Sequence, residues 1–165
     1  MIPFERVDAA VSRWRRTYTT DGADGMPAHV TLIYPFVDDS QLTAGDLGAL
    51  RAVLSAFAPF DVCFATFGRF EGPSRVLYLE PDPVRPFADI IDAIAERFPA
   101  HPPFGGEFDT VVPHLTVAET DDTEVFDDAE RDVARHLPIA TRATEVHLME
   151  HRGGEGWCMR DCISL

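Results

Sequence analysis

The sequence predicts an α+β protein in which one arrangement of helices and strands occurs twice. Amphipathic helical stripes alternate with short β-prone segments, and turn residues separate pairs of these segments as in antiparallel hairpins. The order helix, loop, strand, helix and hairpin can be followed in both halves of the 165-residue chain. We therefore expect one domain, residues 1–165, with two pseudo-symmetric lobes formed by repeats of approximately 1–80 and 81–165.

The first half begins with a predicted helix over residues 6–18, whose apolar stripe is made by Val7, Val11, Trp14 and Tyr18. A loop over 19–28 leads into a strand that ends at Pro35, because proline cannot donate to a sheet ladder. Thr43 and Asp46 form a variant of the capping box at the start of a second helix, which we expect to end before Pro59.

Hairpins close both halves. In the first half, residues 60–70 and 75–80 flank a turn at 71–74. The second half gives, in order, a helix over 87–98, a loop over 99–112, a strand over 111–119, a helix over 125–137 and a hairpin of 139–151 with 157–163.

One short motif stands at the matching place in each half: His29-Val30-Thr31-Leu32 and His114-Leu115-Thr116-Val117. Side chains alternate along a strand, so the histidine and threonine share one face and the two apolar residues share the other. The histidines lie 85 positions apart, and the acidic pairs Asp38-Asp39 and Asp121-Asp122 lie 83 apart. A pseudo-two-fold arrangement of such repeats would bring both motifs to one cleft.

Two histidines that face one phosphate can act as base and acid in a single turnover. For an in-line displacement, their reactive nitrogens should stand roughly 5 to 7 Å apart across the phosphate. The threonine hydroxyls, on the same strand faces, can donate to the non-bridging oxygens, where negative charge collects. This chemistry requires no metal and no other cofactor.

The paired motifs and the internal duplication resemble the 2H phosphoesterase superfamily, which includes the bacterial 2′-5′ RNA ligase and cyclic nucleotide phosphodiesterase proteins. The resemblance implies a two-lobed fold with antiparallel sheets lining a central cleft and helices outside. It also implies that His29 and His114 are the acid/base pair and that Thr31 and Thr116 hold the phosphate. The chain departs from the family at Glu119, where several members carry a basic residue.

The function expected from this resemblance is metal-independent hydrolysis of a 2′,3′-cyclic phosphate on a nucleotide or short RNA end. Two alternatives stay open: a 2′-5′ RNA ligase or 2′-5′ phosphodiesterase, and a non-catalytic nucleotide-binding module. Tyr34 and Phe36 either stack on a base or pack in the core. Arg69, Arg75 and Arg160 are candidates for steering a phosphate, and the sequence does not choose among them.

Composition and charge limit the binding partners and the cellular location that we expect for the chain. A formal net charge of −14 disfavours binding to long duplex nucleic acid. The chain contains no run of about 18 apolar residues that would suggest a membrane span. Three cysteines without a Cys-x-x-Cys motif fit reduced thiols in a cytosol. The N-terminal residues lack the basic and apolar regions of a secretory signal. We expect a cytoplasmic monomer that acts on a small nucleotide or RNA end.

The last hairpin suggests a metal site, because two histidines and two cysteines are predicted on one of its faces: His147, His151, Cys158 and Cys162. Four strand positions span about 13 Å, which is too far for ligands that must each lie about 2 Å from one ion. The sequence therefore predicts no metal site.

Overall fold

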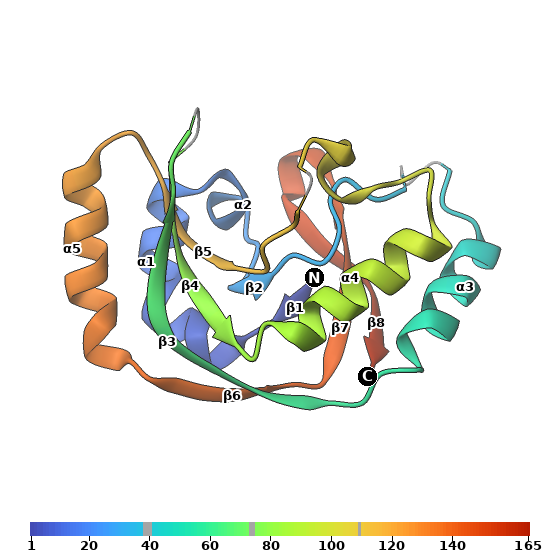
Figure 1. Ribbon diagram of the computed structural model, residues 1–165. Helices are drawn as coiled ribbons and strands as arrows, with labels where there is room; N and C mark the ends of the chain where they lie inside the picture. Colours follow the sequence, from blue (N-terminus) through green and yellow to red (C-terminus); the bar gives the residue numbers. More distant parts are fainter. Residues whose placement is uncertain (38–40, 73–74, 109) are drawn as a thin grey trace.

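Antiparallel strands and covering helices make up the chain, as the sequence predicts (Figure 1). The computed structural model describes residues 1–37, 41–72, 75–108 and 110–165. The acidic pair Asp38-Asp39 and the Pro73-Ser74 part of the predicted turn lie outside the described residues.

The strands are β1 (Ile2–Pro3), β2 (His29–Val30), β3 (Phe60–Phe70), β4 (Val76–Asp82), β5 (Leu115–Glu119), β6 (Ile139–Ala143), β7 (Glu145–His151) and β8 (Trp157–Ser164). The α-helices are α1 (Glu5–Tyr18), α2 (Thr20–Ala23), α3 (Ala44–Leu54), α4 (Arg85–Arg97) and α5 (Thr123–Val133). Short 3₁₀ turns are η1 (Pro103–Gly106), η2 (Ala134–His136) and η3 (Gly153–Glu155).

The larger sheet has four antiparallel strands in the order β5-β4-β3-β6 and curls along its length (Figure 1). The remaining strands form two antiparallel pairs, β1 with β2 and β7 with β8. The backbones of Met1 and His147 exchange both hydrogen bonds, at 2.9 and 2.8 Å, and so join β1 to β7. Each strand that carries a His-x-Thr motif therefore lies at the edge of a set of antiparallel strands.

Several helices pack against elements other than the strand that precedes them in the sequence. α1 follows β1 in the sequence, yet it packs against β5 and α5. α4 follows β4, yet it contacts α3, and α3 contacts β8 (Figure 1). The large sheet also combines β3 and β4 from the first predicted repeat with β5 and β6 from the second. Elements of the units 1–80 and 81–165 are thus intertwined, and their origin by duplication stays a prediction.

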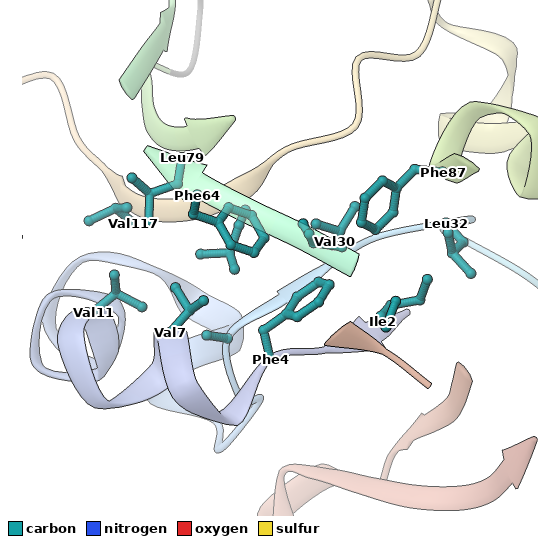
Figure 2. Close-up of a cluster of buried hydrophobic side chains, with 14 of the residues drawn as sticks. Ile2, Phe4, Val7, Val11, Val30, Leu32, Phe64, Leu79, Phe87 and Val117 are labelled. Atoms are coloured by element: carbon teal, nitrogen blue, oxygen red, sulfur yellow. The ribbon is translucent and has the colours of Figure 1, made fainter. Parts of the chain in front are cut away.

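One apolar core joins α1, the short pair β1–β2 and the large sheet. Figure 2 shows Phe4, from the turn between β1 and α1, next to Phe64 of β3 and near Phe87 of α4. The Phe4 ring lies edge-on to Phe64 at a centroid distance of 5.1 Å. Val30 and Val117, the apolar partners of the two motifs, are fully buried in the same cluster. Burial of this surface holds the two motif strands against a common support.

The predicted helices are confirmed, and the Thr43 hydroxyl and Asp46 carboxylate form the predicted capping box. Three expectations are wrong in detail. The predicted loop 19–28 contains the short helix α2, capped by the Thr19 hydroxyl. The motif strands are shorter than predicted: β2 stops at Val30, and β5 starts only after Pro113 and His114. Proline has no N–H to give a ladder, which explains the late start of β5.

The predicted strand 139–151 is two strands. Residues up to Ala143 form β6 and pair with β3, whereas β7 begins at Glu145 and pairs with β8. The apolar and polar residues alternate without a turn signal across Thr144, so periodicity does not reveal that the chain changes sheets there. In the described part of the chain, no helix combines the length and apolar character needed to cross a membrane.

Candidate active site

The two motifs meet at one cavity of about 750 Å³. His29, Thr31, His114 and Thr116 all line it, and so does Tyr34. β2 and β5 contact one another, and they lie side by side in the middle of Figure 1. The structure thus brings to one cavity the residues that the sequence predicted as the acid/base pair, the two phosphate-binding threonines and the stacking tyrosine.

Burial follows the alternation predicted for the motifs. Val30, Leu115 and Val117 are fully buried in the core behind the cavity. Thr31, His114 and Thr116 are partly exposed at the cavity. His29 also lines the cavity but is buried, with 9% of its surface exposed. The apolar residues therefore anchor each motif, and Thr31, His114 and Thr116 are the more accessible polar side chains.

His29 is held by its own strand. Its Nδ1–H donates to the carbonyl oxygen of Pro27 at 2.8 Å, so in the neutral ring Nε2 carries the lone pair. Nε2 then accepts from the Thr31 hydroxyl at 3.1 Å. Burial, together with the Arg15 charge, lowers the pKa of His29 to about 3, against the opposing effects of the Pro27 carbonyl and Asp21. His29 is therefore neutral at physiological pH and presents a basic nitrogen.

His114 is held in the same way. Its Nδ1–H donates to the carbonyl oxygen of Val112 at 2.7 Å, which leaves Nε2 free of the backbone. The rings of Phe70 and Tyr78 pack against the imidazole at centroid distances of 4.9 and 5.3 Å. Burial lowers the pKa of His114, and the hydrogen bond to Val112 opposes this shift. The two motif histidines thus share a tautomer and a backbone anchor.

Two charged residues that sequence reasoning did not select lie beside His29. The Asp21 carboxylate lines the cavity and lies 4.0 Å from His29 Nε2. Arg15 is buried, with 1% of its surface exposed, and donates to Asp21 at 2.7 Å. Burial alone would raise the pKa of Asp21, but Arg15, the Thr19 hydroxyl and His29 together lower it, which keeps Asp21 ionised.

The spacing of residues on α1 marks Arg15 as a buried arginine. It lies four residues after Val11 and eight after Val7, which places it on the apolar face of α1. An arginine at such a position needs buried partners. Asp21 gave no comparable signal, because α2 was predicted to be a loop.

The remaining candidates separate by position. Tyr34 is 55% exposed and contacts Trp157 edge-on at 6.3 Å, at the cavity. Phe36 also lines the cavity, but its ring packs on Phe98 at 5.1 Å. Of the three candidate arginines, Arg160 lines the cavity, whereas Arg69 pairs with Asp127 and Glu130 and Arg75 pairs with Glu71. Glu119 lines the cavity as well.

The last hairpin carries the histidines and cysteines of the rejected metal site. A β-bulge after Leu148 shifts the register, so His147 faces Cys162 as predicted while His151 faces Trp157 in place of Cys158. Within the described ranges, Glu145, His147 and Cys162 offer ligand atoms within 4.8 Å of one another. His147 Nε2 already lies within hydrogen-bond distance of a Glu145 oxygen, at 2.6 Å. The expectation that the protein uses no metal stays a prediction.

Comparison with known proteins identifies the family. A model of the 2′-5′ RNA ligase superfamily, whose members are 2H phosphoesterases, matches residues 3–155. The chain belongs to this superfamily. The match includes both His-x-Thr motifs, so the resemblance drawn from those motifs is confirmed.

Named members of the superfamily are distant relatives. "Putative phosphoesterase" of Geobacillus kaustophilus is 26% identical over 118 residues, which are 71% of this chain and 65% of that protein. The chain thus spans slightly less than two thirds of that relative. A protein of the same name from Bacillus pumilus is 27% identical over 139 residues, which are 84% of this chain and 76% of that protein.

Among solved structures, E. coli LigT complexed with 3′-AMP has a TM-score of 0.63 at 17% identity and covers 99% of this chain and 93% of its own. LigT complexed with NADP⁺ has a TM-score of 0.56 at 16% identity, covering 99% and 92%. At this identity the likeness establishes the superfamily fold, mixed helices with curled antiparallel sheets.

Proposed function

We propose that the protein is a metal-independent phosphoesterase that hydrolyses a 2′,3′-cyclic phosphate on a nucleotide or a short RNA end. The observation that carries the proposal is the shared cavity: His29 and His114 both line it, and each has Nδ1 anchored to a backbone carbonyl. This directs each Nε2 away from the backbone; a bound substrate would replace the Thr31 hydroxyl at His29 Nε2, and both nitrogens would then serve proton transfer.

In the proposed reaction, one neutral imidazole takes a proton from water as the water oxygen bonds to phosphorus. The other imidazole, which is protonated, gives its proton to the 2′ or 3′ oxygen as the P–O bond of the cyclic phosphate breaks. The product is a nucleoside monophosphate, and the two rings end with exchanged protonation. The hydroxyls of Thr31 and Thr116 would donate to the non-bridging oxygens, where charge develops.

The cavity suits a small nucleotide. Tyr34 is exposed at the cavity beside Trp157, so either ring offers a face on which a base can stack. Arg160 lines the cavity and is the candidate cation for binding the phosphate. Complexes of LigT with 3′-AMP and NADP⁺ support a nucleotide ligand through the shared fold. The net charge of −14 supports a short substrate over a long duplex.

The experiment is turnover of 2′,3′-cyclic nucleotides by the purified protein in the presence of a chelator, with His29→Ala and His114→Ala compared with the wild type. We expect each substitution to lower kcat by at least about 10²-fold, because general acid–base catalysis contributes factors of this size. His136→Gln is the matched control, since this exposed histidine lies in η2, outside the cavity. Wild-type rates in both alanine variants would end the proposal.

Two further measurements separate the alternative functions. Cleavage or joining of 2′-5′ linked oligonucleotides in preference to ring opening would favour the 2′-5′ phosphodiesterase or ligase. Tight calorimetric binding of a 2′-phosphorylated nucleotide, with no turnover of any cyclic phosphate, would favour a nucleotide-binding module.

A further inference from the structure

We propose that Arg15 is a positioning residue that couples the two motifs: it fixes the second motif strand and, through Asp21, the surroundings of His29. The inference rests on the proposed function, which needs the two imidazoles at a defined separation. Arg15 itself does not line the cavity, so it would act through the groups it holds.

Two hydrogen bonds and one 4.0 Å charge contact connect the two motifs through Arg15 and Asp21. The guanidinium of Arg15 donates through one NH₂ group to the backbone carbonyl of Thr116, at 2.7 Å. Its other NH₂ group donates to Asp21 Oδ2, also at 2.7 Å. The same Asp21 oxygen lies 4.0 Å from His29 Nε2. A planar guanidinium bonded at both ends fixes the two bonded groups relative to one another.

The position is costly for a purely structural residue. Arg15 lies on the apolar face of α1, where Val7 and Val11 are fully buried. Its Nε–H is buried without a hydrogen-bond partner in the described part of the chain. An apolar side chain there would avoid both the buried charge and the unsatisfied donor. The arginine is therefore explained better by what it holds than by packing.

The network also sets the charge around His29. The groups that face this imidazole are Arg15 from α1, Asp21 from α2 and the amino group of Met1 next to β1. Arg15 disfavours the imidazolium, whereas Asp21 favours it. During turnover a protonated His29 would therefore have the Asp21 carboxylate beside it, and Arg15 keeps that carboxylate ionised and in place.

Three variants separate these effects. Arg15→Lys keeps the charge and loses the two-armed hydrogen bonding, so kcat should fall about tenfold while KM changes less than about twofold, because a misplaced catalytic group slows the chemical step. Arg15→Gln removes the charge and should raise the pKa of His29, measured by NMR titration of the imidazole. Asp21→Asn keeps the shape, removes the carboxylate charge and should also lower kcat about tenfold.

Arg142→Lys is the matched control. Arg142 likewise bonds one carboxylate, of Asp61, and one backbone carbonyl, of Pro59, but it lies on β6 outside the catalytic cavity. We expect wild-type kcat and an unchanged His29 titration. Thermal melts show whether each variant is folded. If Arg15→Gln does not fold, Asp21→Asn, which leaves Arg15 in place, still tests the network.

The proposal is overturned if Arg15→Lys keeps wild-type kcat, if it loses no more than Arg142→Lys, or if removal of the Arg15 charge leaves the His29 pKa unmoved. The titration needs no substrate. If the wild type fails to open any cyclic phosphate, the proposed function fails while the titration still tests the Arg15 network.

Discussion

His29 and His114 are each fixed by a residue two positions upstream. Pro27 and Val112 accept the Nδ1–H through their carbonyl oxygens, so the neutral rings share one tautomer without any partner side chain. The anchor is local to each motif, which explains how two strands in different settings can present the same nitrogen. Burial, together with the Arg15 charge at His29, lowers the pKa of both rings below that of free histidine.

This burial predicts an acidic pH optimum. The base must be neutral and the acid protonated, so kcat/KM falls below the lower and above the higher of the two pKa values of the free enzyme. Both pKa values are lowered from 6.5, His29 to about 3. We therefore expect kcat/KM for a 2′,3′-cyclic nucleotide to be maximal below pH 6.5 and to decline above it. A maximum above pH 7, with the protein folded throughout, would contradict this account.

At the level of the elements, β3 and β4 support the second motif. Gly68 of β3 lies directly opposite Tyr78 of β4, and the Tyr78 ring in turn packs against His114. A Cβ on Gly68 would overlap the Tyr78 ring. The absence of a side chain at residue 68 therefore lets the tyrosine lie flat across β3 and form one wall around the imidazole.

We predict that Gly68→Ala displaces Tyr78 and destabilises the protein by about 1–3 kcal/mol, as overpacking of a well-packed site does. Urea denaturation measures the change, and the same displacement should lower kcat by moving His114. Gly48→Ala is the control with the opposite sign: among the described residues, nothing beyond the local helix backbone crowds its added methyl group in α3, so it should stabilise by about 0.4–1 kcal/mol. Equal stability of the two variants would argue against the support role of Gly68.

The sequence predicts the helices and motifs better than it predicts which strands pair with one another. Helical stripes and the paired motifs are local patterns, so α1, α3, α4, α5 and both site histidines could be found from spacing alone. The change of sheet at Thr144 and the bulge after Leu148 depend on which strand lies alongside, and periodicity carries no such information. Arg15 is not predicted as a site residue because a charged side chain is expected on the polar face of a helix, although its spacing places it on the apolar face of α1. Asp21 is not predicted because the sequence indicates a loop where α2 forms.

At the scale of the whole molecule, the two motif strands are edge strands of different sheets that meet over one core. Ile2, Phe4 and Val30 from the N-terminal strands pack with Phe64 and Val117 of the large sheet (Figure 2). Since close-packed protein interiors deform little, this shared core restricts how the two motifs face one another. The proposed chemistry thus depends on the whole chain: β2 alone, or β5 alone, supplies half a site.

A crystal structure with a nucleoside 2′- or 3′-monophosphate bound would test most directly whether both motifs act on one phosphate. We predict that Nε2 of His29 and Nε2 of His114 lie on opposite sides of the phosphorus, each within about 3 Å of a phosphate oxygen. The hydroxyls of Thr31 and Thr116 should reach the non-bridging oxygens. A phosphate held by Arg160 alone, or by one histidine with the other turned away, would contradict the account.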